Sequence, residues 1–323
     1  MTAPARTALV ACMKDEGIFV LEWLAYHAGL GFDRIVVATN GCTDGSDALL
    51  AHLAARGILH HIDHDPQGRP PQDAAMDRVL EWARDTLITH LLHIDSDEFL
   101  VLLDGTLHDL LERTQKADVV PLPWRLFGDS GVMDWTPGDL VLDRNTMAEE
   151  APAPGEAKFK CLFKLASFAR ATDHNPLDPQ VADPVVLTPD GDPLSNASLY
   201  QKKSSRFRPH DVAARARSAQ VYHYAVRSED VFLMKNDRGD GQGKEGDTKY
   251  HLNSHWHRMA NRNDTHAPQM RAHLARVNAQ LAEWRADPET RRLERACQDW
   301  FETRRDAVLT DENRRAWTRK AMA

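Results

Sequence analysis

The chain has 323 residues, of which 42% are hydrophobic and 27% charged, so it can form one large domain with a sizeable core. Its net charge of −8 argues against a general nucleic-acid binder, which would carry a basic surface. No apolar run reaches the roughly 20 residues that a membrane-spanning helix needs, and residues 1–6 do not resemble a signal peptide. We therefore expect a cytoplasmic protein whose four widely spaced cysteines are free thiols.

Strand and helix signals alternate along the first third of the chain. Short apolar runs predict four strands, at residues 7–13, 34–39, 57–62 and 89–94. Apolar residues at helical spacing predict three helices, at residues 17–30, about 44–56 and 73–87. This order predicts an α/β fold with a mostly parallel sheet and helices on both faces, in which ligands bind at the carboxyl ends of the strands.

The rest of the chain is less regular. Residues 118–127 predict a strand that Pro121 and Pro123 keep at a sheet edge or interrupt. Residues 172–196 are rich in Pro and Asp and predict a long surface loop. The remaining predictions are a short aromatic strand at 220–226, a mobile glycine-rich segment at 236–247, and helices from 267 onward.

An acidic cluster is the most informative local feature. The apolar run that ends at Ile94 is followed by Asp95, Asp97 and Glu98, and then by further apolar residues. Carboxylates gathered at a strand end repel one another unless a cation offsets their charge. Their oxygen atoms suit Mg²⁺ or Mn²⁺, which keep coordination positions open for substrate phosphates. The cluster predicts a metal ion that holds a diphosphate, and a solvated acidic turn is the alternative.

Three further polar segments also follow predicted strands. They lie at residues 14–16, 40–44 and 64–65. Because the carboxyl ends of parallel strands meet at one edge of a sheet, we expect them to converge with the acidic cluster on one site.

A series of sequence phrases occurs in order along residues 7–265. They are KDE at 14–16, LEWLAYH at 21–27, GFDRIVV at 31–37, DSDEFL at 95–100, FGDSG at 127–131 and HY at 223–224. With these phrases the chain resembles a branch of the family 2-like glycosyltransferases, which have a GT-A fold. The resemblance implies a Rossmann-like catalytic domain at residues 1–265 and a helical C-terminal extension at 266–323.

The resemblance also implies an activity and a set of site residues. The activity is transfer of a sugar from a nucleotide-diphospho-sugar, by default a UDP-sugar, to a glycan or glycoconjugate. Mn²⁺ or Mg²⁺ would be bound by Asp95 and Asp97, with His223 completing the set. The implied donor-binding residues are Lys14, Glu16, Asn40, Asp44, Gln72 and Asp95. Relatives often carry Gln-x-x-x-Tyr-Asn where this chain has Gln72, Met76 and Asp77.

Inverting transfer, which the resemblance favours, needs a base for the acceptor hydroxyl. Asp129, in the 127–131 turn, and Asp173, beside His174, are the candidates, with Asp134 as a third; an aspartate in such a turn can also be only a turn residue.

Other residues are candidates for supporting roles. Trp124 and Trp135 could stack on an acceptor sugar, and core packing is the alternative. Lys235, Arg238 and Lys244 could close over a diphosphate. The arginine-rich C-terminal helices are expected to pack on the catalytic domain, and contact with the inner face of an anionic membrane is the alternative.

Two other functions remain open. A sugar nucleotidyltransferase also combines an α/β sheet with metal-binding acids, but it would normally carry a glycine-rich basic loop after the first strand, which residues 14–17 lack. A non-catalytic glycan-binding protein could retain a transferase fold, but the intact Asp95 and Asp97 speak against it.

Overall fold

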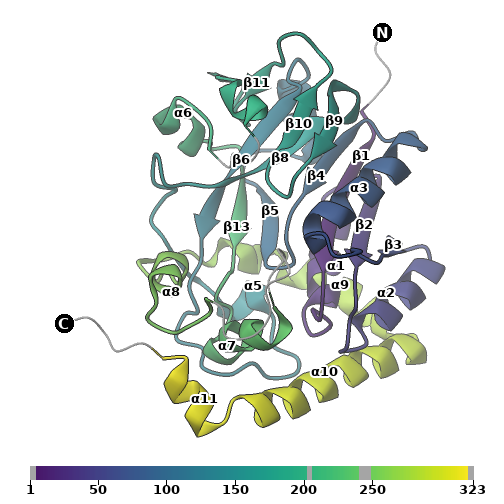
Figure 1. Ribbon diagram of the computed structural model, residues 1–323, viewed down its shortest axis with the longest axis vertical. Coiled ribbons are helices and arrows are strands. Elements are labelled where there is room, and N and C mark those ends of the chain that lie inside the picture. Colours follow the sequence, from purple (N-terminus) through teal and green to yellow (C-terminus); the bar gives the residue numbers. More distant parts are fainter. Residues whose placement is uncertain (1–4, 202–205, 240–248, 319–323) are drawn as a thin grey trace.

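A mixed sheet runs through the computed structural model, which describes residues 5–201, 206–239 and 249–318 (Figure 1). Its main path has the strand order β12-β11-β6-β8-β4-β1-β2-β3, and β13 pairs with β5 and β6. The strands of this sheet are β1 (Thr7–Met13), β2 (Arg34–Thr39), β3 (His60–Asp63), β4 (His90–His93), β5 (Glu98–Leu102), β6 (Val119–Leu126), β8 (Phe159–Lys164), β11 (Val186–Leu187), β12 (Pro193–Leu194) and β13 (Ala219–His223).

Helices and two small strand pairs surround the sheet. The strand pairs are β7 (Met147–Ala148) with β14 (Thr265–His266), and β9 (Phe168–Ala171) with β10 (Pro176–Pro179). The helices are α1 (Val20–Ala28), α2 (Ser46–Ala55), α3 (Pro71–Arg84), α4 (Leu107–Arg113), α5 (Val141–Arg144), α6 (His210–Ala214), α7 (Glu229–Arg238), α8 (His255–Ala260), α9 (Leu274–Arg285), α10 (Pro288–Val308), α11 (Asp311–Ala316), and the 3-10 helices η1 (Leu165–Ser167), η2 (Ala197–Tyr200) and η3 (Pro268–His273).

The N-terminal half of the sheet confirms the predicted fold class. Strands β3, β2, β1 and β4 are parallel neighbours, so their carboxyl ends lie along one edge. Successive residues of a strand point to opposite faces, and β1 accordingly divides its side chains between two cores. Leu9 packs in the core that contains α1, α2, α9 and α10, whereas Val10 packs with α3. Helices therefore cover both faces, as predicted.

The second half of the sheet is mixed. Strand β8 is antiparallel to both β4 and β6, which it separates. Strand β13 runs antiparallel to β5 and parallel to β6, with His223 opposite Glu98. This pairing brings the end of β13 beside the acidic cluster, although more than 120 residues of chain separate them.

Strand β6 corrects the prediction that its prolines place it at an edge or interrupt it. It is continuous and pairs with β8, β11 and β13. The backbone N–H groups of Val119 and Trp124 point to opposite sides, toward Val185 and Lys158. Pro121 and Pro123 share the orientation of Val119, and β11 ends and β13 begins on either side of them. The prolines thus lack an N–H where the sheet has no strand to accept one.

Other expectations in the second half need adjustment. The predicted surface loop at 172–196 contains the short strands β10, β11 and β12. The predicted strand at 220–226 ends at His223, and the start of the predicted mobile segment belongs to α7, which ends at Arg238. Residues 240–248, which include Lys244, lie outside the described residues.

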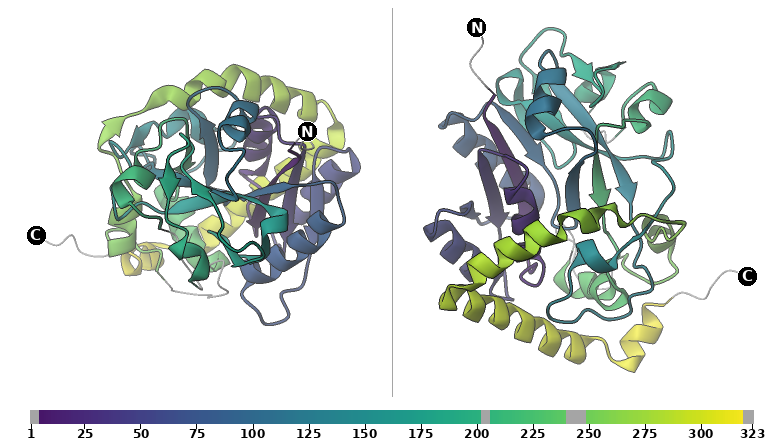
Figure 2. Two further views of the ribbon diagram at one scale, coloured as in Figure 1. Left: turned by 90° about the horizontal axis from the view of Figure 1, so that it is seen from above. Right: turned by 180° about the vertical axis from the view of Figure 1, so that it is seen from behind.

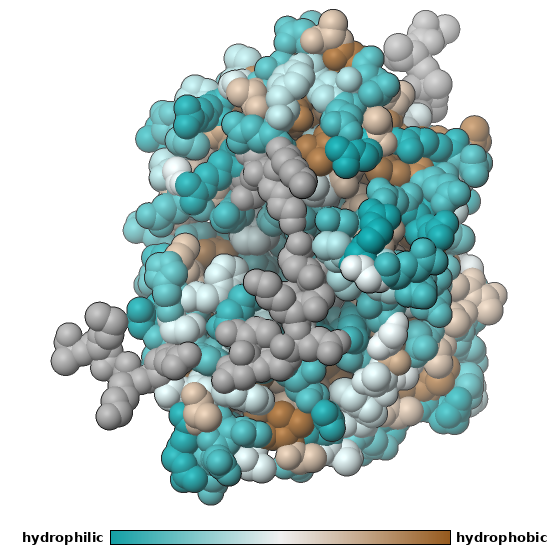
Figure 3. Space-filling view, viewed as in Figure 1, coloured by the Kyte–Doolittle hydropathy of each residue, from teal (hydrophilic) through white to brown (hydrophobic). Residues whose placement is uncertain are grey.

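The C-terminal helices pack on the helices that flank the sheet. Helix α9 crosses the rear face of the molecule against α1, and α10 runs along α2 and α7 (Figure 2). Val277 and Cys297 are fully buried in the same core as Leu9 of β1. Packing, the favoured prediction for these helices, is therefore observed, while the proposed domain boundary at residue 265 stays a prediction. None of the described helices is long and apolar enough to cross a membrane. The face in Figure 3 is mostly hydrophilic, with scattered hydrophobic residues.

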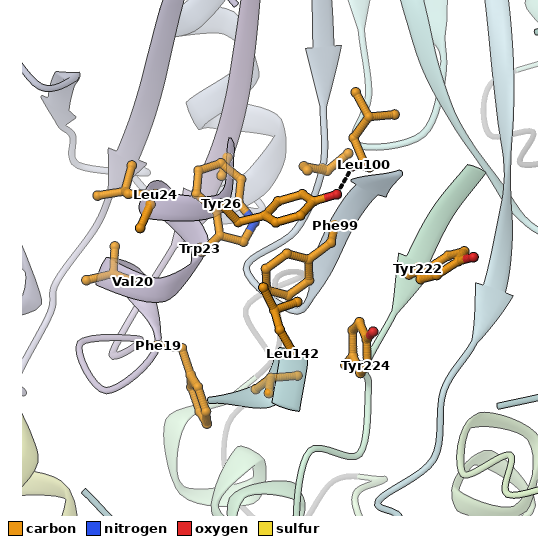
Figure 4. Close-up of a cluster of buried hydrophobic side chains, with 14 of the residues drawn as sticks. Phe19, Val20, Trp23, Leu24, Tyr26, Phe99, Leu100, Leu142, Tyr222 and Tyr224 are labelled. Carbon is orange, nitrogen blue, oxygen red and sulfur yellow. Dashed lines mark hydrogen bonds between the residues drawn. The ribbon is translucent and has the colours of Figure 1, made fainter. Parts of the chain in front are cut away.

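Helix α1 is tied to the strand that follows the acidic cluster. The Trp23 indole donates a hydrogen bond of 2.9 Å to the carbonyl of Glu98. The Tyr26 hydroxyl donates one of 2.9 Å to the carbonyl of Leu100 (Figure 4). Both aromatic rings are fully buried, so these bonds fix β5 against α1 without access of water.

We expect Tyr26→Phe to lower the free energy of unfolding by about 1–2 kcal/mol, because the buried Leu100 carbonyl loses its donor while the ring stays in place. Urea denaturation measures the change. Tyr200→Phe is the matched control, since Tyr200 is 60% exposed and should leave stability unaltered. Equal midpoints for Tyr26→Phe and the wild type would show that the bond contributes nothing.

Candidate functional site

A cavity of about 470 Å³ opens at the carboxyl edge of the sheet. Its lining includes Lys14 after β1, Asn40 after β2, and Asp95 and Asp97 after β4. Pro66 also lines it, whereas His64 and Asp65 do not. The polar segments that follow β1, β2 and β4 therefore converge as expected from the parallel strand order.

Asp95 is held from two sides. Its Oδ2 accepts a hydrogen bond of 2.9 Å from Lys160 Nζ, and its Oδ1 accepts one of 3.1 Å from Gln72 Nε2. The turn that carries it is closed by Glu98, whose side chain accepts the Asp95 N–H at 3.0 Å. Gln72 lines the cavity as well, and its role in donor binding stays a prediction.

Lys160 of β8 is completely buried beneath the acidic cluster. Its ammonium lies 2.9 Å from Asp95, 3.7 Å from Glu98 and 2.8 Å from the carbonyl oxygen of Asp173. Burial alone would raise the pKa of Asp95, but the Lys160 charge brings it below its ordinary value. Burial raises the pKa of Glu98 well above its ordinary value; the Lys160 charge opposes this rise, and the charges of Asp95 and Asp97 add to it.

Asp97 has a separate cation. Lys235 of α7 donates 2.8 Å to Asp97 Oδ2 and 2.9 Å to the carbonyl of Ala225. Asp97 Oδ1 lies 3.5 Å from Nε2 of His223, at the end of β13. Burial opposes ionisation of Asp97, yet Lys235 and His223 lower its pKa well below the ordinary value, so the carboxylate is charged at neutral pH.

The donor atoms of this cluster suit a hard divalent ion. Asp97 offers a carboxylate oxygen on the cavity wall, the kind of donor that suits Mn²⁺ and Mg²⁺, and His223 offers an imidazole nitrogen beside it. Asp95 does not complete a compact set with them. Within the described ranges, the group whose ligand atoms all lie within 4.8 Å of one another is Asp15, Cys42 and Asp44. Asp97 and His223 thus offer two ligands to an ion. Asp95 is paired with Lys160 instead and is not grouped with them.

Glu16 lines the cavity, whereas Asp44 lies outside it and holds a loop. Glu16 is buried between Arg227, at 2.9 Å, and Arg238, which also lines the cavity. Asp44 is outside the lining and accepts the N–H of Gly17 at 2.8 Å. A Cβ on Gly17 would come 2.5 Å from the sulfur of Cys297, so only glycine lets the loop approach α10 this closely.

The three candidate bases occupy different places. Asp173 and its neighbour His174 line the cavity. Asp129 lies outside it, where its carboxylate accepts hydrogen bonds from Asn261, Asn263 and the N–H of Gly131. Asp134 is paired with Arg314, 3.3 Å away. Of the three, only Asp173 is among the residues that line the described cavity.

The two tryptophans that were candidates for stacking on a sugar lie in different environments. Trp124 lines the cavity, with its ring centroid 4.1 Å from that of His223 and 5.4 Å from that of His174. Trp135 is buried between Phe19 and Phe301, so the structure gives it the core role that was the alternative.

Sequence patterns missed Lys160 and Arg227. Lys160 lies 65 residues from Asp95, and no sequence pattern relates the two positions. The signal available was a lysine inside the apolar run FKCLFK, since a charged residue in a buried strand needs a partner.

No family model and no curated protein matches the chain. Several solved structures resemble part of it. S. aureus TarS 1–349 is 14% identical over 50% of this chain and 47% of its own, with a TM-score of 0.31. Glucosyl-3-phosphoglycerate synthase from Mycobacterium tuberculosis, in complex with Mn²⁺, UDP and glucosyl-3-phosphoglycerate, is 18% identical over 38% and 44%, with a TM-score of 0.27. HddC from Yersinia pseudotuberculosis is 8% identical over 50% and 78%, with a TM-score of 0.31. The match thus spans about half the length of TarS 1–349.

We expect Lys160→Met to destabilise the fold by about 3–5 kcal/mol, because it leaves Asp95 beside Glu98 without their buried cation. Adding Asp95→Asn should recover part of the loss, because it removes the carboxylate that Lys160 keeps ionised. Guanidinium denaturation measures both variants, and exposed Lys116→Met serves as the control. Wild-type stability in Lys160→Met would contradict this account.

Proposed function

We propose that the chain is a metal-dependent glycosyltransferase, which moves a sugar from a nucleotide-diphospho-sugar to a hydroxyl of a glycan or glycoconjugate. The observation that carries the proposal is the charge pattern of one cavity. Asp97 and His223 can bind a divalent ion there, and Lys14, Lys235 and Arg238 line the same space. Acids with an ion, next to ammonium and guanidinium groups, are what a diphosphate needs.

The size of the cavity supports a small-molecule donor. Its volume of about 470 Å³ falls within the range of roughly 300–1,000 Å³ for small-molecule sites. Its position, outside the carboxyl ends of parallel strands, is where open α/β sheets bind their ligands. UDP is the default nucleotide of the proposal.

The residues at the diphosphate end have distinct roles. Asp97 and His223 would hold Mn²⁺ or Mg²⁺, which as a Lewis acid offsets the charge of the departing nucleoside diphosphate. Lys235 keeps the Asp97 carboxylate oriented and ionised. Arg238, held by Glu16, presents a second cation to the phosphates.

The nucleoside end lies at the first two strands. Lys14 and Asn40 line the cavity and can contact the base and ribose. Asp95, fixed by Lys160 and Gln72, is an acceptor for hydroxyl groups of the donor. Asp44 acts indirectly, because it fixes Gly17 and so the loop that carries Lys14 and Glu16.

The acceptor side is assigned to Trp124 and Asp173. Trp124 offers an aromatic surface in the cavity, and Asp173 offers a carboxylate that can receive a proton. A base opposite the departing diphosphate fits a single displacement with inversion. Membrane attachment through the C-terminal helices is not part of the proposal, since they pack on the domain and pair charges of both signs, as in Arg285 with Glu294.

The deciding experiment is a panel of nucleotide-sugars with Mn²⁺, in which release of nucleotide and of pyrophosphate is followed separately. We expect nucleotide release without pyrophosphate from at least one donor, and a loss of about 100-fold or more in Asp97→Asn, because the ion site loses a charge. Exposed Asp85→Asn is the matched control and should retain wild-type rates.

Two results would contradict the proposal. Exchange of pyrophosphate into the donor would indicate a sugar nucleotidyltransferase. Absence of turnover with every donor, together with no Mn²⁺-dependent rise in melting temperature with UDP, GDP, CDP or dTDP, would indicate a non-catalytic protein, since a ligand that binds the folded state must raise it.

A further inference from the structure

The turn between β9 and β10 carries two neighbouring side chains into the cavity wall, Asp173 and His174. The hydroxyl oxygen of Thr172 accepts the N–H groups of His174, at 3.2 Å, and of Asn175, at 3.1 Å. The carbonyl oxygen of Asp173 lies 2.8 Å from Lys160 Nζ and 3.1 Å from His93 Nδ1. The backbone of the turn is therefore fixed from both sides.

The hydrogen bond of His174 determines which ring nitrogen carries hydrogen. Nδ1 lies 2.8 Å from the carbonyl oxygen of Phe159, and a carbonyl oxygen can only accept. Nδ1 is thus the donor, and in the neutral ring Nε2 has the free lone pair. Asp173 Oδ2 lies 3.6 Å from this Nε2.

The surroundings keep the ring neutral. Burial lowers the pKa of His174, Lys160 lowers it further, and Asp173, the Phe159 carbonyl and Asp95 oppose these effects. His93, on the other side of the Asp173 carbonyl, also has a lowered pKa, about 4, because it is buried. The lone pair of Nε2 in the neutral ring therefore faces the Asp173 carboxyl group, whose Oδ2 lies 3.6 Å away.

One proton added between these two acceptors would create a hydrogen bond that joins them. A proton on Asp173 can be donated to His174 Nε2, and a proton on Nε2 can be donated to Asp173. The side chains are partly open to the cavity, with 16% and 24% of their surface exposed, so a substrate can reach them.

We propose that Asp173 and His174 together form the base of the transfer reaction, a proposal that rests on the proposed glycosyltransferase function. The acceptor oxygen forms a bond to the anomeric carbon, and the bond from that carbon to the donor phosphate breaks, with its electron pair leaving on the nucleoside diphosphate. The acceptor O–H bond breaks in the same step. The released proton goes to the Asp173 carboxylate. The protonated Asp173 then donates a hydrogen bond to His174 Nε2.

The position of Trp124 supports this assignment. Its ring centroid lies 5.4 Å from that of His174 and 4.1 Å from that of His223. Trp124 belongs to β6, which pairs with β8, where Phe159 binds His174, and with β13, which ends at His223. A sugar placed against this ring would lie near both the ion-binding pair and the proposed base.

Asp173 touches the substrate in this scheme, and His174 is a positioning residue that acts through it. We expect His174→Phe, which keeps a ring beside Trp124, to lower kcat for donor hydrolysis by water about 100-fold. It should also move the acidic limb of the pH–rate profile to lower pH, because the shared proton loses one of its two acceptors. His174→Gln, which offers an amide oxygen, should recover about tenfold, and exposed His108→Phe should match the wild type.

A role in folding alone predicts a different result. His174→Phe would then lower the rate at every pH without moving the limb, and His174→Gln would bring no recovery; either outcome overturns the proposal. Binding of UDP with Mn²⁺ should be unchanged in both variants, because neither touches Asp97 or His223.

Nitrogen-15 NMR of the His174 ring tests the pair without turnover. We expect hydrogen on Nδ1 at neutral pH, and a titration of His174 that moves to lower pH in Asp173→Asn, since the carboxylate that stabilises the imidazolium is lost. Hydrogen on Nε2, or an unmoved titration, overturns the pair. If the NMR result holds but the wild type turns over no donor, the proposed function has failed and the role as a base fails with it.

Discussion

One buried ammonium holds the candidate site together. Lys160 has no exposed surface, and it contacts Asp95 after β4, Glu98 at the start of β5 and the carbonyl of Asp173 in the turn between β9 and β10. These three segments would repel or separate without a cation, because buried carboxyl groups are costly when unpaired. The position of Lys160 on the antiparallel strand β8, next to β4, is what places the charge there. Asp95 and Asp173, to which we assign donor binding and proton acceptance, thus share one support.

A second network of ion pairs fixes the part of the cavity wall that Glu16 and helix α7 form, and it involves the C-terminal helices. Glu16 binds Arg227 and Arg238, and Arg227 lies over the ring of Phe19 with its guanidinium carbon 3.5 Å from the centroid. Helix α10 supports this wall through Cys297 against Gly17, and through Arg305, which pairs with Asp230 at the start of α7. The helical C-terminal region is therefore part of the framework that orients α7, and α7 supplies both Lys235 and Arg238 to the cavity.

Sequence patterns predicted the strands and their order well, but they did not predict the side-chain contacts between distant segments. The strands β1 and β2 have the predicted bounds, because fully buried strands leave short apolar runs that are easy to recognise. The meeting of Lys14, Asn40 and Asp95 at one edge followed from parallel strand order alone. Contacts between distant segments left no such pattern: Lys160 with Asp95, Arg227 with Glu16, and the closure of Asp129 by Asn261 all depend on tertiary packing. Pro121 and Pro123 were misjudged for the same reason, since the gap between β11 and β13 is not visible in the sequence.

The two aspartates of the motif have different electrostatic partners, and this difference assigns their chemistry. Asp95 is neutralised by a lysine that is fully buried and cannot leave, so its charge is already balanced before any ligand arrives. Asp97 is paired with Lys235, whose ammonium lines the cavity, and with an imidazole that can coordinate an ion. A divalent ion would therefore add its charge at Asp97, where a diphosphate can meet both the ion and Lys235. Asp173 and His174, the pair proposed as the base, are linked to Asp95 through Lys160, which contacts the Asp173 carbonyl. In the proposed reaction the departing diphosphate would be met at Asp97 and Lys235, whereas the acceptor proton would go to Asp173, so that different groups would serve the two sides of the displacement.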